Sequence, residues 1–137
     1  MWWIYALLSA LFASLTAIFA KIGVTNVNSN LATAIRTIII LIVAWAIVFF
    51  RGEYKTFSSI SKHSLLFLII SGFATGLSWI FYFKALQIGK VSQVAPVDKL
   101  SVALTILLSV LFLGEVLSWK TALGASLIIA GTIILIL

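Results

Sequence analysis

The chain has 137 residues, of which 64% are hydrophobic and 9% are charged, and its formal net charge is +6. Soluble domains carry about 25% charged residues, so this composition excludes an ordinary soluble domain and predicts one membrane domain over residues 1–137. The basic residues stand mostly at the ends of apolar runs and form no cluster with interleaved aromatic residues, so nucleic-acid binding is not expected. The absence of cysteine excludes disulfides and thiolate metal sites.

Five apolar runs follow one another, each close to or above the ~17–25 residues that cross a hydrocarbon core. The first run lacks the basic leading segment of a signal peptide, so we expect a retained helix. No run shows the sustained alternation of a barrel strand. The sequence therefore predicts an all-α membrane protein, a bundle of five transmembrane helices with spans at about Trp2–Ala20, Leu31–Phe50, Ser64–Phe83, Val91–Leu113 and Thr121–Leu137.

The first two spans carry polar residues at helical spacing. Ser9 and Thr16 share a face of small residues in the first span. Arg36 lies about one and a half turns inside the second span. A charged residue at such a depth costs about 2.5–3.5 kcal/mol, so chains seldom keep one without a use. We therefore expect Arg36 either to form a structural ion pair or to bind an anionic group.

The third span carries hydroxyl groups on one face, at Ser71, Thr75, Ser78 and Tyr82, with Trp79 on the flank. Hydroxyls and small residues also mediate ordinary helix packing in lipid, and that interpretation stays open for each of them. Stripes on four spans, together with charged residues, favour a water-accessible cavity. Its predicted lining is Ser9, Thr16, Thr75, Ser78, Trp79, Tyr82, Ser101 and Thr105.

The fourth span contains two adjacent charged residues, Asp98 and Lys99. At about 100° per residue, Asp98, Ser101, Thr105 and Ser109 lie within an arc of roughly 80°, and Lys99 points about 100° away from Asp98, so the two charges are not expected to cancel simply. Asp98 is about as deep as Arg36 from the same side, which allows the two to pair. Alternatively Asp98 exchanges protons or binds a cationic substrate, and Arg36 or Lys99 takes anionic groups.

Pro96 lies about one turn inside the fourth span. One interpretation is a helix start with Ser92 as the N-cap, where the missing N–H of proline is not needed. The other is a helix break that frees carbonyl groups to line a cavity. Both interpretations stay open from the sequence.

The fifth span has a smooth apolar ridge at Gly124, Ile128 and Gly131. Such a ridge suits close helix contact within the bundle or between two chains. The alternative is that these residues simply face the lipid. Aromatic residues gather at the ends of spans on the N-terminal side, as in an interfacial belt, and the basic residues are nearly balanced between the two sides. The long loop after Phe50 favours a cytoplasmic N-terminus in a multi-pass protein of the cell membrane.

The run from Tyr82 to Glu115 and the glycine-rich segment Gly124–Gly131 resemble the EamA domain of the drug/metabolite transporter superfamily. The resemblance covers essentially the whole chain, since the first helix ending in Lys21 and the position of Arg36 also match. Further matching features are Ala85-Leu86, Gly89, Ala95-Pro96 and Leu113-Gly114-Glu115.

Most members of this family carry two such domains, ten spans in inverted orientation, and this chain looks like the half-size branch. Members of that branch often show APxDKLS, which stands here at Ala95–Ser101. The resemblance implies transport of a small molecule by a homodimer, and two oppositely inserted chains would copy the inverted arrangement. The last helix is also similar to the dimer-forming helix of small multidrug-resistance proteins, but their acidic residue in the first span is missing.

Two functional hypotheses follow. The first is a secondary transporter that moves a small metabolite by alternating access. The second is a non-transporting membrane subunit that packs with and stabilises a partner protein. The chain has no serine–histidine pair, no HExxH run, no paired carboxylates at helical spacing and no nucleotide-binding loop, so we expect no enzyme, cofactor or metal site.

Overall fold

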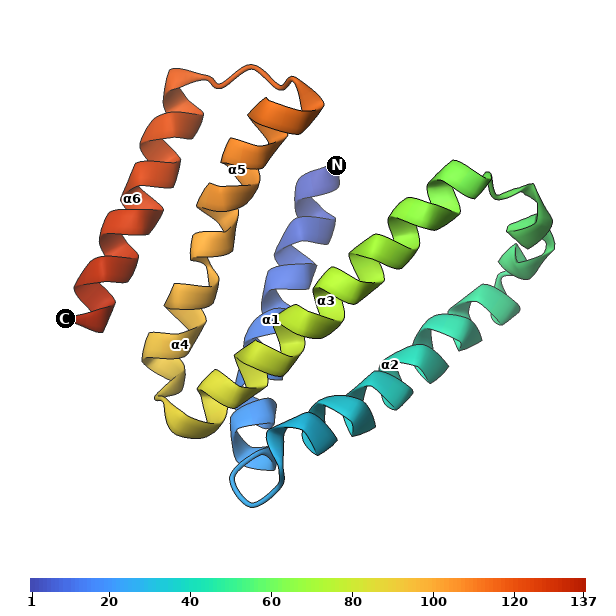
Figure 1. Cartoon of the computed structure of the whole chain (residues 1–137), viewed down its shortest axis with the longest axis horizontal. Coiled ribbons are helices and arrows are strands. Elements are labelled where there is room, and N and C mark those ends of the chain that lie inside the picture. The colour runs from blue at the N-terminus through green and yellow to red at the C-terminus, as the bar shows by residue number, and fades with distance from the viewer. The chain divides into compact units, whose positions relative to one another are not determined.

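The structure, a computed structural model, describes residues 1–137 and is built of helices without strands (Figure 1). Five spans are long and apolar enough to cross a membrane, and two consecutive helices form the fourth. The predicted all-α membrane fold with five spans is confirmed. The elements are α1 (Trp2–Gly23), α2 (Ser29–Phe50), the 3₁₀ helix η1 (Glu53–Ser59), α3 (Lys62–Ile88), α4 (Val91–Asp98), α5 (Leu100–Leu113) and α6 (Trp119–Ile136).

Polar caps set the beginnings of several helices. The side chain of Asn28 accepts hydrogen bonds from the backbone N–H groups of Asn30 (2.9 Å) and Leu31 (3.4 Å), so α2 begins before its apolar run. The Ser118 hydroxyl accepts one from the N–H of Thr121 at the start of α6 (3.1 Å). Each cap satisfies a backbone donor that the first turn leaves without an intrahelical partner.

Two glycines in the left-handed conformation end helices. Gly52 follows α2 with φ +69°, and Gly114 ends α5 with φ +67°. Residues with a Cβ rarely adopt such angles, so glycine is the natural stop at both places. α5 thus ends at Leu113, where the fourth apolar run of the sequence also ends.

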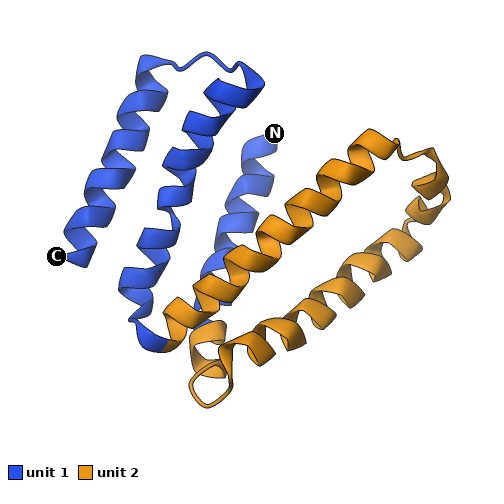
Figure 2. Ribbon diagram, viewed as in Figure 1, with its two compact units in different colours: residues 1–18, 88–137 blue, residues 19–87 orange.

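The chain forms two compact units, Met1–Ile18 with Ile88–Leu137 (unit 1) and Phe19–Gln87 (unit 2) (Figure 2). Within unit 1, α6 packs beside α5 and also contacts α4. Within unit 2, η1 joins the end of α2 to the beginning of α3 (Figure 1).

Hydrogen bonds in unit 2 tie the end of α3 to the turn after α1. The ammonium of Lys21 donates to the carbonyl of Leu86 (2.6 Å), and the Gln87 amide donates to the carbonyls of Val24 (3.2 Å) and Val27 (2.9 Å). A cation and an amide thus satisfy carbonyls near helix ends, where no intrahelical donor is left. The buried residues beside these bonds are Ala20, Val24, Ser29, Thr33, Phe83 and Leu86.

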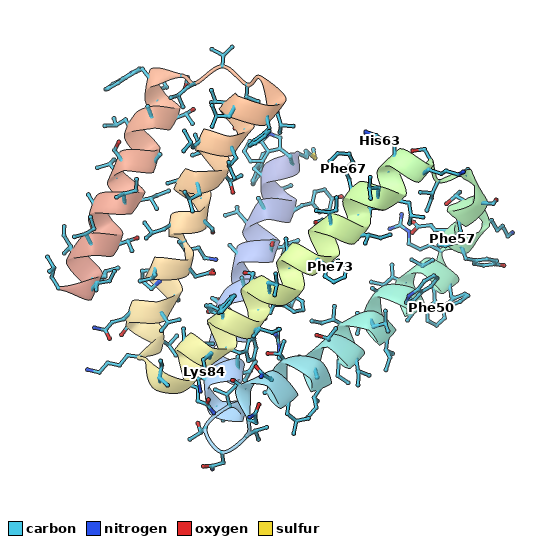
Figure 3. The ribbon with its side chains drawn as sticks, viewed as in Figure 1. Phe50, Phe57, His63, Phe67, Phe73 and Lys84 are labelled. Atoms are coloured by element: carbon cyan, nitrogen blue, oxygen red, sulfur yellow. The ribbon has the colours of Figure 1, made fainter.

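Most of each span is exposed within the single chain. No more than 11% of the residues in any span window are buried. Large apolar side chains project from the helices, among them Phe67 and Phe73 of α3 and Phe50 at the end of α2 (Figure 3). These surfaces suit contact with lipid tails or with further helices.

Candidate functional site

The fourth span is broken at Lys99. α4 ends at Asp98 and α5 begins at Leu100. At 1.5 Å per residue, Lys99 lies about 12 Å along the axis from the start of α4 at Val91. The backbone N–H of Lys99 donates to the carbonyls of Pro96 (3.0 Å) and Ala95 (3.3 Å), as in a tightened last turn. Lys99 stays in the right-handed helical region (φ −70°, ψ −9°), so the break is a one-residue interruption of the span, and the structure favours it over a simple helix start.

The predicted N-cap at Ser92 is wrong. α4 begins at Val91, with Lys90 in the N-cap position and no side-chain hydrogen bond there. Pro96 consequently lies inside α4, where its missing N–H and its ring disturb the regular hydrogen-bond ladder just before the break.

Asp98 and Lys99 form an ion pair at the break. The Lys99 Nζ lies 3.3 Å from Asp98 Oδ2, and the side chains are 57% and 34% exposed for Lys99 and Asp98. The expectation that these neighbours would not simply cancel is thus wrong for this structure. It assumed a continuous helix and treated the side chains as fixed directions, whereas the flexible four-carbon stem of Lys99 brings the ammonium back to the carboxylate.

The break also divides the polar stripe predicted for the fourth span. Asp98 ends α4, whereas Ser101, Thr105 and Ser109 lie on one face of α5, which we call the α5 stripe. Ser101 and Thr105 are exposed, and the half-buried Ser109 donates its hydroxyl to the carbonyl of Ile106 (2.9 Å). Ser101 and Thr105 are thus largely open within the single chain.

A residue of the fifth span reaches the break. The buried Thr132 of α6 donates its hydroxyl to the carbonyl of Pro96 (3.3 Å). Sequence reasoning missed Thr132 because it treated α6 as a purely apolar ridge. Of the ridge residues, Gly124 is exposed, and Ile128 and Gly131 are half-buried, so their role in a contact between chains stays a prediction.

Unit 2 contains a second group of polar and aromatic residues, the Arg36 cluster. The guanidinium carbon of Arg36 lies 4.5 Å from the centre of the Phe83 ring and 5.2 Å from that of Trp79. Tyr82 interacts electrostatically with the same guanidinium. Arg36 Nη1 is buried and has no hydrogen-bond acceptor. Sequence reasoning included Trp79 and Tyr82 but missed Phe83, although Trp79 and Phe83 are one helical turn apart.

Aromatic contacts offset only part of the cost of placing Arg36 here. A cation over aromatic rings gains about 0.5–2 kcal/mol. A charge at membrane depth costs about 2.5–3.5 kcal/mol even on the lenient scale. Glu53 pairs with Arg51 outside the spans (2.9 Å), and Asp98 belongs to the other unit and lies against Lys99. The pairing of Arg36 with Asp98 stays a prediction.

The remaining predicted lining residues lie on α1 and α3. Ser9, Thr75 and Ser78 are exposed, and Thr16 is half-buried. The Thr75 hydroxyl donates to the carbonyl of Ser71 (2.9 Å), which satisfies the donor within its own helix. The Thr75 hydroxyl therefore needs no ligand, and ordinary helix packing in the membrane accounts for this residue.

An open apolar groove of about 520 Å³ runs along α3. It contains the spacing Gly72-x-x-x-Gly76, and a Cβ built at either glycine meets nothing within 4 Å. At about 100° per residue the groove lies on the side of α3 away from Thr75 and Ser78, so it is separate from the hydroxyl face. Apolar grooves with GxxxG spacing suit close helix contact. Its lining is Ile69, Gly72, Phe73, Gly76, Leu77 and Ile80.

Comparison with known proteins places this chain among membrane carriers. The profile of the EamA-like transporter family matches residues 1–137. The chain belongs to the EamA-like transporter family. A relative from Sinorhizobium sp., named an uncharacterized transporter in the cobO 3′ region, is 50% identical over 134 residues, which are 98% of this chain and 95% of the relative.

A second relative has a similar length. An uncharacterized protein of Methanocaldococcus jannaschii is 33% identical over 132 residues, which are 96% of this chain and 93% of that protein. No solved structure matches the chain significantly. The EamA-like assignment and the five apolar helices together make this chain a multi-pass membrane transporter.

Proposed function

We propose that this EamA-like chain is a secondary transporter of the cell membrane that moves a small metabolite by alternating access and works as a homodimer. The observation that carries the proposal is the helix break at Lys99. A span that loses its regular backbone within the membrane is tolerated only where the irregular part is buried in protein or lines a water-filled cavity. Broken helices of this kind form substrate and ion sites in secondary transporters.

The chemistry around the break supports a polar passage. The Asp98–Lys99 pair is partly exposed, and the first hydroxyls of the α5 stripe follow within two turns. In a water-filled passage such a partly exposed ion pair is worth only about 0–1 kcal/mol, so a solute or a proton can exchange with it at little cost. Asp98 is the coupling residue in this proposal, and Ser101 and Thr105 contact the solute.

The proposal requires two copies because one chain encloses only part of a substrate cavity. No more than 11% of the residues in any span window are buried, and the family resemblance makes this chain half of a ten-helix arrangement. In the proposed dimer, α6 supplies the contact through Gly124, Ile128 and Gly131. Insertion in opposite orientations gives the two copies the inverted relationship of a tandem transporter. The long loop after Phe50 favours one of these two orientations, and in the copy inserted that way the N-terminus is cytoplasmic.

Uptake by reconstituted protein tests the proposal with a mixture of candidate solutes. Proteoliposomes are incubated with the low-molecular-weight filtrate of a cell extract under an imposed proton gradient, and their contents are identified by mass spectrometry. We expect one or a few compounds to be enriched over protein-free liposomes. The Ser101→Trp variant, whose bulky side chain fills the α5 stripe, should lose that enrichment while remaining folded.

The alternative function, a non-transporting subunit, gives the opposite result. In that case the folded wild-type protein enriches no compound, whatever gradient is imposed, and a partner membrane protein co-purifies with it instead. That outcome would remove the transporter proposal.

A further inference from the structure

The Arg36 cluster presents a cation without an anion. The guanidinium lies over Phe83 and Trp79, yet its buried Nη1 lacks an acceptor. The part of unit 2 formed by α2 and α3 contains no acidic residue. The aromatic rings hold the planar guanidinium in place but offer no oxygen lone pair to its N–H groups, which are strong donors.

From this geometry we propose that Arg36 binds the carboxylate or phosphate group of the transported solute, so the cargo is a small organic anion. The inference rests on the proposed function and adds the substrate class. A guanidinium fork fits both groups because it donates two parallel hydrogen bonds to a pair of anionic oxygens. The Trp79 and Phe83 rings restrict the orientation of the fork, so less freedom is lost when the anion arrives.

The surroundings of Arg36 suit a solute that enters and leaves. Arg36 as a whole is only half-buried, whereas its Nη1 is enclosed. Tyr82, which interacts with Arg36, belongs to the hydroxyl face of α3. Trp79 and Phe83, over which the guanidinium lies, are not lining residues of the apolar α3 groove.

Two other sources of anionic oxygen compete with a solute. One is Asp98, the acidic residue inside a span, which in this structure is 3.3 Å from Lys99 Nζ. The other is the phosphate of a lipid headgroup, which has the same chemistry as a phosphate-bearing solute. The test must separate these three acceptors.

Binding to purified protein provides the test. Delipidated protein in maltoside detergent, which carries neither carboxylate nor phosphate, is titrated with succinate, with inorganic phosphate and with the uncharged succinamide. Trp79, 5.2 Å from the guanidinium, serves as the fluorescent reporter, and the Trp79→Phe variant identifies its signal. Arg51→Gln is the matched control because Arg51 ends the same helix, pairs with Glu53 and is well exposed.

We expect succinate or phosphate to bind and succinamide not to bind. Arg36→Gln should weaken the binding at least about tenfold, Arg36→Lys by a smaller factor, and Arg51→Gln not at all, because only Arg36 donates charged hydrogen bonds to the bound anion. Three results would overturn the inference. These are equal binding by wild type and Arg36→Gln, anion binding that appears only in Asp98→Asn, and Arg36-dependent binding of short-chain phosphatidylglycerol without binding of soluble anions.

The same proteins in liposomes separate this inference from the proposed function. If a neutral or cationic solute crosses the membrane and anions neither cross nor compete, the proposed transport function is supported and the proposed anionic cargo is wrong. If anions bind through Arg36 and no solute crosses, the proposed binding site is supported and the proposed transport function is wrong.

Discussion

The hydroxyl of Thr132 donates a hydrogen bond to the carbonyl of Pro96, with 3.3 Å between the two oxygen atoms. The same carbonyl accepts from the N–H of Lys99 at 3.0 Å. α6 is thereby attached to the last turn of α4, immediately before the break. The fifth span is thus a support for the broken span as well as an apolar surface.

Removing the Thr132 hydroxyl should loosen this support. Thr132→Val keeps the volume and loses the hydrogen bond, so we expect the free energy of unfolding to fall by about 0.5–1.5 kcal/mol. Thermal unfolding in detergent micelles, followed by circular dichroism, measures the change. Thr132→Ser should restore most of it, whereas Ser126→Ala, which removes only a bond within α6, should have little effect. Equal stability of Thr132→Val and wild type would show that the bond contributes nothing.

Pro96→Ala should separate stability from transport. Alanine restores an N–H and relieves the clash of the ring with the preceding turn, so the free energy of unfolding should rise by about 1–3 kcal/mol. A straighter fourth span presents fewer free carbonyl groups, so uptake into proteoliposomes should slow at the same time. A variant that is both more stable and fully active would speak against a functional break.

Asp98→Asn should uncouple uptake from the proton gradient. The amide cannot release a proton, so an imposed pH gradient should no longer accelerate uptake, while exchange of solute without a gradient continues. Proteoliposome uptake at several imposed gradients gives the comparison. Glu53→Gln is the matched control because Glu53 is an ion-paired carboxylate outside the spans. If Asp98→Asn keeps the wild-type response to pH, Asp98 has no coupling role.

A bulky side chain on α6 should weaken the dimer. Gly124→Leu places a large side chain where an added Cβ now meets nothing within 4 Å, so it blocks close approach of a second helix. Energy transfer between differently labelled chains in liposomes reports association. Gly76→Leu, in the α3 groove, is the comparison variant. Loss of association in Gly76→Leu alone would move the interface from α6 to α3.

The number and the type of the elements could be predicted from the sequence because long apolar runs in lipid allow little besides helices. The boundaries were less predictable. α3 runs on to Ile88, past the apolar run that was predicted to end at Phe83, because Lys21 and Gln87 hydrogen-bond across its end. Such bonds join residues more than sixty positions apart, and hydropathy does not register them.

At the site, the sequence identified individual residues but not their arrangement. Arg36, Asp98 and the hydroxyl stripes stand out because polar groups are costly in lipid. The Asp98–Lys99 pair was mispredicted because helical angles apply only to an unbroken helix, and the sequence left the effect of Pro96 open. Phe83 is one apolar residue among many in α3, so only the position of the Arg36 guanidinium shows its role.

Solvent access to the α5 stripe tests the central claim most directly. The chain has no cysteine, so single cysteines at Ser101, Thr105 and Leu107 can be labelled without background. Leu107 is the matched control because it is exposed on the opposite side of α5. In membrane vesicles, a charged, membrane-impermeant thiol reagent should label positions 101 and 105 but not 107. Absence of labelling at 101 and 105 in the folded dimer, or equal labelling at all three positions, would contradict a water-filled passage beside the break.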